Sequence, residues 1–93
     1  GRLRTATATR LASPLLSRTV GAWVAESEIA DMLRETERAH EGVAIGSYPF
    51  FRDGRTGANF VVRATEQTRV DTTVEALIAG LRASGREPVD GGI

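Results

Sequence analysis

Three stretches of the chain alternate apolar with polar residues, which is the pattern of half-buried β-strands. We predict strands over residues 18–24, 43–47 and 58–64. The apolar residues that share one face of the first and third strands are Val20, Ala22, Val24, Phe60, Val62 and Ala64. Residues 86–89 would add a short fourth strand at an edge of the sheet.

A first amphipathic helix is predicted between the first two strands. Ile29 and Leu33 recur at helical spacing over a segment that runs from about Glu28 to His40. Ser27 is the expected N-cap, because its hydroxyl can accept a hydrogen bond from the first turn. Gly42 is expected to end this helix as the residue after the C-cap.

A second amphipathic helix follows the third strand and has the clearest periodicity in the chain. We expect its N-cap at Thr65 or Thr68, and Gly85 should end it. Gly80 favours close packing near its last turns, because glycine there disfavours a helix relative to alanine. The apolar face consists of Val70, Val74, Leu77, Ile78 and Leu81.

Turn signals separate the second and third strands. Asp53 and Gly54 form the strongest hairpin signal in the chain, and Pro49 is expected to end the second strand before that turn. The end of the chain, residues 91–93, is glycine-rich and is expected to be frayed.

The element order β-α-β-β-α, with a short fourth strand in addition, predicts an α+β fold of the ferredoxin-like split β-α-β type. Both helices would cover one face of the sheet, and the first and third strands would lie side by side in its middle. We place this domain at residues 17–90 and its basic N-terminal arm or linker at residues 1–16. The predicted core consists of Trp23, Ile29, Leu33, Ile45, Phe60, Val62, Val74, Leu77 and Leu81.

Composition narrows the classes of function. With 93 residues, no Cys and one His, the sequence predicts no disulfide framework and no metal site. The 12 basic residues balance 12 acidic ones, and such neutrality argues against nucleic acid as a partner. No apolar run is long enough for a membrane span, so we expect no membrane contact. No nucleophile–base set is evident, so the sequence predicts no catalytic residue and leaves enzymatic activity undecided.

Candidate contact residues concentrate around the predicted hairpin. Aromatic residues cluster within residues 48–51, and arginines lie in and beside the turn. They favour either docking of a neighbouring domain or, as the alternative, binding of a nucleotide or a single-stranded nucleic acid. The full candidate set is Ser47, Tyr48, Phe50, Phe51, Arg52, Arg55 and Arg63.

The segments 45–54 and 59–64, Ile-Gly-Ser-Tyr-Pro-Phe-Phe-Arg-Asp-Gly and Asn-Phe-Val-Val-Arg-Ala, carry a family resemblance that covers about Pro14 to Arg82. They resemble the C-terminal part of molybdopterin-binding proteins related to competence- and damage-inducible protein A. The same region is similar to the middle domain of FAD synthases, and residues 14–20 look like the family's entry into that domain.

The resemblance implies a non-catalytic accessory module in a bacterial, cytoplasmic protein. Its partner would be the upstream domain of the parent chain, and self-association is a second way for it to act. We expect no cofactor in this segment, because any molybdopterin or nucleotide would belong to the upstream domain of the parent protein.

Overall fold

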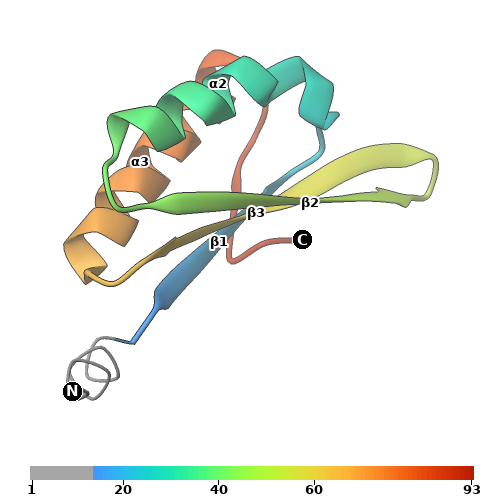
Figure 1. Ribbon diagram of the computed structural model, residues 1–93. Helices are drawn as coiled ribbons and strands as arrows, with labels where there is room; N and C mark the ends of the chain where they lie inside the picture. The colour runs from blue at the N-terminus through green and yellow to red at the C-terminus, as the bar shows by residue number, and fades with distance from the viewer. Residues whose placement is uncertain (1–13) are drawn as a thin grey trace, which may run out of the picture.

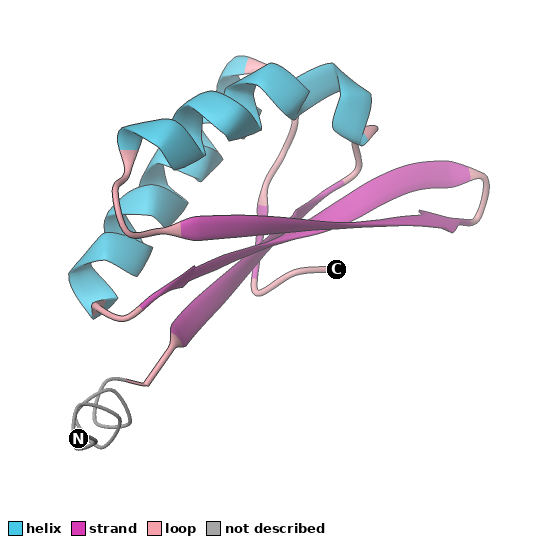
Figure 2. Ribbon diagram, in the orientation of Figure 1, coloured by secondary structure: helices cyan, strands magenta, loops and turns pink. Residues whose placement is uncertain are grey.

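The computed structural model describes residues 14–93, so the predicted basic arm lies outside the described residues except for its last three. Four strands and two helices follow one another along the chain (Figure 1). They are β1 (Leu16–Ala22), α2 (Glu26–Ala39), β2 (Ala44–Arg52), β3 (Arg55–Ala64), α3 (Gln67–Ala83) and β4 (Val89–Asp90). Both helices lie on one side of the sheet, and the β2–β3 hairpin projects beyond them (Figure 2).

The sheet has the strand order β2-β3-β1-β4, and every neighbouring pair is antiparallel. Strands β1 and β2 are therefore parallel to each other, with β3 between them. This arrangement is a split β-α-β unit, so the predicted α+β, ferredoxin-like fold is confirmed, including the central position of β1 and β3.

The hydrophobic core lies between the sheet and the two helices. Val20 of β1 is paired with Phe60 of β3, and both side chains are fully buried. Helix α3 packs on β1 and β3, while α2 lies against α3 and β2. Seven of the nine predicted core residues are buried: Ile29, Leu33, Phe60, Val62, Val74, Leu77 and Leu81. Ile45 is partly buried against this core, whereas Trp23 lies outside it.

The helix N-termini differ from the predicted ones. Ala25 is the N-cap of α2, so Ser27 lies in the first turn and the prediction of a serine cap is wrong. The Ala25 N–H donates instead to the Glu28 carboxylate at 3.1 Å, which is one half of a capping box. This bond, together with Arg86, lowers the pKa of Glu28. Helix α3 has Glu66 as its N-cap, without a side-chain hydrogen bond, so neither predicted threonine caps it.

The helix C-termini depend on glycine. Gly85, with φ of +78°, follows the C-cap of α3 as predicted. Its N–H donates to the Arg82 carbonyl and that of Arg86 to the Leu81 carbonyl, which together form a Schellman motif. Helix α2 has its C-cap at His40, so Gly42 lies two residues beyond the cap rather than one, with φ of +80°.

Strand β2 is longer than predicted, because it continues through Pro49 to Arg52. The two-residue turn Asp53–Gly54 has positive φ at both positions, 53° and 75°, as a type I′ turn requires. In such a hairpin Arg52 and Arg55 form a hydrogen-bonded pair, and the pairs then alternate along the strands. Pro49 therefore occupies a non-hydrogen-bonded position on an edge strand, where its missing N–H costs no bond to β3.

The last residues are held to the sheet, unlike the frayed end that we expected. Strand β4 pairs with β1 at the sheet edge, and the Gly91 N–H donates to the Thr19 carbonyl. The Asn59 side chain accepts a hydrogen bond from the Ile93 N–H at 2.8 Å and donates to the Ile93 carbonyl at 3.1 Å. Residues 91–93 thus lie on the face of the sheet opposite the helices.

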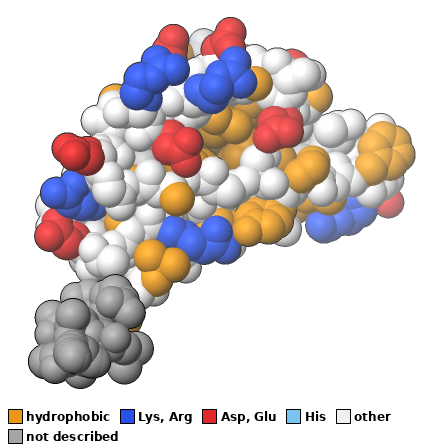
Figure 3. Space-filling model, in the orientation of Figure 1, with side chains coloured by type: hydrophobic (Ala, Val, Ile, Leu, Met, Phe, Trp, Pro, Cys, Tyr) orange, Lys and Arg blue, Asp and Glu red, His pale blue; other side chains and the backbone are white. Residues whose placement is uncertain are grey.

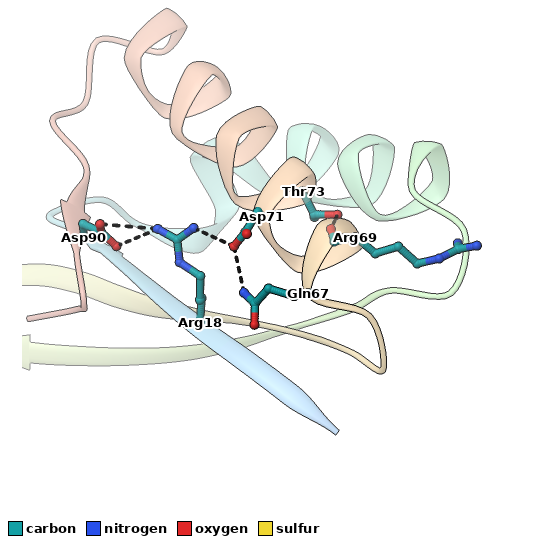
Figure 4. A network of polar contacts seen from close by, with 6 residues as sticks. All are labelled: Arg18, Gln67, Arg69, Asp71, Thr73 and Asp90. Carbon is teal, nitrogen blue, oxygen red and sulfur yellow. Dashed lines mark hydrogen bonds and ion pairs between the residues drawn. The ribbon is translucent and has the colours of Figure 1, made fainter. Parts of the chain in front are cut away.

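A polar network joins β1 to α3 and β4 (Figure 4). The Arg18 guanidinium contacts Asp71 at 3.1 Å and Asp90 at 3.2 Å. Gln67 donates to the same Asp71 carboxylate at 2.9 Å. Gln67, followed by Arg18, lowers the pKa of Asp71, and both aspartates raise the pKa of Arg18. Strand β1, helix α3 and strand β4, which are distant in the chain, are therefore linked through the Arg18 side chain.

Neither α2 nor α3 combines the length and the apolar character that a membrane crossing requires, and no other helix occurs within residues 14–93.

We predict that Phe60→Ala leaves the chain largely unfolded at 25 °C. Deletion of a fully buried Phe costs about 3–5 kcal/mol, which is comparable with the whole stability of a small domain. Circular dichroism at 25 °C measures the folded signal of Phe60→Ala, and urea unfolding gives the free energy of unfolding of the unchanged chain and of the control variant. Val61→Ala, one position along and on the opposite face, should cost less than about 1 kcal/mol. Equal losses for the two variants would contradict this assignment of faces.

We predict that Asp71→Asn makes stability less sensitive to acid. Because the pKa of Asp71 lies below its usual value of 3.8, the carboxylate stabilises the fold at neutral pH. That contribution is lost as the pH falls below 3.8 towards the lower pKa of the folded state. Urea unfolding between about pH 7 and pH 2 should show a shallower decline for the variant. An unchanged decline, equal to that of a Glu75→Gln control, would refute the prediction.

Candidate functional site

The predicted contact residues all lie on the β2–β3 hairpin, and the alternation of side chains divides them between its two faces. Ser47 and Phe51 are on the face that the helices cover, as is Ile45. On the opposite face, which we call the open face, are Tyr48, Phe50, Arg52, Arg55 and Arg63. The aromatic cluster expected within residues 48–51 is therefore two separate surfaces.

Arginines cover the aromatic rings of the open face. The Arg52 guanidinium lies 4.6 Å from the centre of the Phe50 ring, and that of Arg55 lies 4.2 Å from the Trp23 ring. Phe50 and Trp23 meet edge to face, with their ring centres 5.3 Å apart. These distances are within the range of favourable cation–π and aromatic contacts.

Among the predicted contact residues of the open face, Tyr48 has the most accessible ring. Half of its surface is exposed, and the Arg63 guanidinium lies 6.0 Å from the ring centre. Arg63 also donates a hydrogen bond of 3.1 Å to the Tyr48 hydroxyl. One edge of this ring is thereby held in place while much of the ring remains in contact with solvent.

Sequence reasoning missed Trp23 as a member of this surface by assigning it to the core. The signal was present in the strand pattern, because Val20, Ala22 and Val24 define the buried side and Trp23 falls between the last two. Large aromatic side chains are usually expected in a core, and that expectation outweighed the alternation.

Gly57 provides the space in which the aromatic pair packs. A Cβ atom at this position would lie 2.5 Å from the Phe50 Cζ atom and 3.1 Å from the Trp23 Cε3 atom. Gly46 stands in a similar relation to Tyr48, whose Cε1 atom would be 3.2 Å from an added Cβ. The rings of Phe50, Trp23 and Tyr48 therefore lie close to the sheet backbone, next to glycines that have no side chain.

Charge is distributed unequally between the two layers of the fold. Helix α2 carries five acidic residues and two arginines, and α3 carries two of each. The open-face positions of β1, β2 and β3 carry three arginines and no acidic residue. Figure 3 shows charges of both signs on the helical layer and hydrophobic side chains beside basic ones lower on the molecule. The neutral net charge therefore conceals a basic sheet face.

A pocket lies on the other side of the hairpin, between α2 and the edge strand β2. We call it the α2–β2 pocket; its volume is about 160 Å³. The Ile45 N–H at its wall donates to the Glu37 carboxylate at 2.8 Å, while the buried Ser47 hydroxyl has no hydrogen-bond partner in the described part of the chain. Phe51, on the same face of β2, is 73% exposed. The lining residues are Glu26, Ala30, Leu33, Arg34, Glu37, Ile45 and Ser47.

A second cavity of about 160 Å³ lies where the end of α2 meets the start of α3. His40 lines it, with its Nδ1 atom 2.7 Å from the Thr36 carbonyl oxygen. Arg69, another lining residue, contacts the Glu41 carbonyl and the Glu66 carboxylate. These groups join the two helix ends to each other, so we assign this cavity a structural role.

The fold and its surfaces define a class: a ferredoxin-like α+β domain with one helix-covered sheet face and one open face of stacked arginines and aromatic rings. The comparison with protein families then identifies the family. The family described as FAD synthase, middle domain, matches residues 14–90, and the chain belongs to it. The same comparisons found no match among curated proteins or solved structures.

We predict that Gly57→Ala destabilises the fold by about 1–3 kcal/mol, because the added methyl group displaces Phe50 and Trp23. The emission of Trp23, the only tryptophan, should shift towards that of a solvated indole. Urea unfolding and fluorescence spectra measure the two effects. Thr56→Ala, on the adjacent residue and the other face, is the control. Equal effects from the two variants would contradict the packing described.

Proposed function

We propose that this domain is a non-catalytic accessory module that packs against another domain of its parent protein through the α2–β2 pocket and Phe51. Two observations on one face of β2 carry this proposal. Phe51 is 73% exposed, and the buried Ser47 hydroxyl lacks a hydrogen-bond partner within residues 14–93. An apolar contact over Phe51 would remove its surface from water. A donor or acceptor from the docked domain would at the same time satisfy Ser47.

The hydroxyl groups of the helices support a structural role for those elements. Thr36 and Thr73 donate to backbone carbonyls one turn earlier, at 2.8 and 2.7 Å. Ser84 does the same at 3.0 Å. These hydroxyls have their hydrogen-bond partners within their own helices, and within residues 14–93 they are not held against a base that could activate them.

The sheet edges favour docking by a face over docking by an added strand. On β2, the N–H of Ile45 is already taken by Glu37, and Pro49 has no N–H to offer. The opposite edge is β4, which has only two residues. Short edges and proline are common protections against strand addition. A partner therefore meets side chains, and Phe51 is the most exposed large hydrophobic side chain of the hairpin.

The partner that we propose is an upstream domain that handles a pterin or a nucleotide. Membership of the FAD synthase middle-domain family supports a nucleotide-handling parent protein. The resemblance to proteins related to competence- and damage-inducible protein A favours a molybdopterin-binding-like domain in that position. Any cofactor would be bound there, and the module would position or stabilise that domain in the cytoplasm. Self-association through the same surface is the competing outcome.

Phe51→Ala tests the docking surface. We expect it to weaken binding to the separately produced upstream domain about 10- to 100-fold, as for a central interface aromatic. Titration calorimetry measures the affinity, and urea unfolding checks that the variant still folds. Phe50→Ala is the matched control, because Phe50 is the adjacent residue on the opposite face.

Equal weakening by Phe50→Ala, or none by Phe51→Ala, would overturn the proposal. Ser47→Ala adds a second measurement. Removal of the unpaired buried hydroxyl should stabilise the free chain by about 1 kcal/mol, yet weaken docking because the partner loses its hydrogen bond. Concentration-dependent dimerisation abolished by Phe51→Ala would instead assign the surface to self-association.

A further inference from the structure

We propose that the open face of the hairpin binds single-stranded nucleic acid, with Arg52, Arg55 and Arg63 on phosphates and Tyr48 beneath a base. This site is separate from the docking surface proposed above, because the two occupy opposite faces of β2. It also goes beyond the accessory role, which requires no ligand on the open face.

The arginines of the open face are available for an anion. Within residues 14–93, Arg18, Arg34, Arg69 and Arg86 form ion pairs with carboxylates. Over the same residues, Arg52, Arg55 and Arg63 make no such pair, and their contacts are with the Phe50, Trp23 and Tyr48 rings. A cation–π contact uses none of the guanidinium's N–H donors, so those of Arg52 and Arg55 can contact phosphate oxygens. Arg63 donates one N–H to the Tyr48 hydroxyl at 3.1 Å and has others for a phosphate.

Aromatic rings and positive charges lie together on the open face. Binding of a nucleic acid strand requires both, because its bases stack on rings and its phosphates contact cations. Tyr48 is half exposed and presents a ring on which a base can stack. The Arg52 and Arg55 guanidinium groups, which lie over Phe50 and Trp23, are further groups that can contact a base, because bases also stack on arginine. An acidic protein surface would use the three charges but leave the Tyr48 ring without a matching group.

The shape of the site favours a single strand over a duplex. Stacking on Tyr48 requires an unpaired base, whereas a duplex presents only base edges in its grooves. The bound strand would run along the β2–β3 hairpin, because residues 91–93 occupy the neighbouring part of the open face. Gly92 lies there against Thr19 and Asn59.

The neutral composition does not oppose this proposal. Zero net charge disfavours an anionic partner only where charges of both signs are mixed over the whole surface. Here the excess acidic residues are on α2, on the far side of the sheet from the three arginines. The phosphates would therefore meet a locally basic face.

The test uses the full chain of 93 residues and a fluorescently labelled single-stranded RNA of about 12 nucleotides, within the site sizes of small single-strand-binding domains. Anisotropy gives the dissociation constant between about 50 and 200 mM salt. With three phosphate contacts, the logarithm of the binding constant should fall with the logarithm of salt concentration with a slope of about −2. Trp23, the only tryptophan, should report binding by a change in its emission, since it lies on this face.

Four substitutions locate the contacts. Arg52→Gln, Arg55→Gln and Arg63→Gln should each weaken binding and reduce the salt slope by about 0.7. Tyr48→Ala should weaken binding about ten-fold with the slope unchanged, because stacking does not release counterions. Tyr48→Phe keeps the ring and should restore most of that loss. Arg38→Gln, on helix α2, is the matched control and should have no effect.

Three results would overturn the proposal. The first is binding that is undetectable at low salt, or that is equal for the control and the hairpin variants. The second is equal affinity for a mononucleotide or for a duplex of the same length. The third is loss of binding only when Arg2, Arg4 and Arg10 are changed to Gln with Trp23 emission unaffected, which would assign the binding to the N-terminal residues.

Discussion

The constraint on which this structure depends is that helices cover one face of the sheet and leave the other uncovered. Successive residues of a strand point to opposite faces, so each strand must sort its side chains between a dry layer and an exposed one. In β3, Phe60 and Val62 are fully buried beneath the helices, while Val61 and Arg63 on the opposite face remain partly exposed. The pairing of β3 with β1 aligns Phe60 with Val20 and so places the centre of the core.

The tip of the hairpin lies beyond the helical layer. Strands β2 and β3 extend past α2 and α3, so no helix covers either face of the hairpin tip (Figure 1). On one face the rings of Phe50 and Trp23 lie beneath arginines, which keeps polar groups between them and water. On the other face Phe51 remains 73% exposed. The two faces of one hairpin therefore differ in the kind of partner that they suit.

The location of charge matters more for this domain than its total. Zero net charge at neutral pH would place the chain among proteins with no preference for anions. The folded chain instead concentrates acidic residues on α2 and, within residues 14–93, leaves the arginines of the open face without carboxylate partners. Two carboxylates of α3 and β4 are used internally, as Arg18 holds Asp71 and Asp90 across the sheet edge (Figure 4).

Local signals within single elements of the sequence determined the fold. Three signals were sufficient to predict the fold: the period-2 pattern of Phe60, Val62 and Ala64, the helical repeat from Val70 to Leu81, and the Asp53–Gly54 turn. These signals are local, because each depends on the geometry of one element. The candidate contact residues lie on one hairpin for the same local reason, since they surround the Asp53–Gly54 turn.

Other features depended on groups that are distant in the chain. Pro49 could remain inside β2 only because that strand lies at the sheet edge, which is a property of the strand order. Ile93 is held to the sheet through the Asn59 side chain, which belongs to β3. Trp23 and Phe50, which come from different parts of the chain, meet edge to face on the open face. Only the tertiary structure decided these, because which face is buried is a property of the assembled layers.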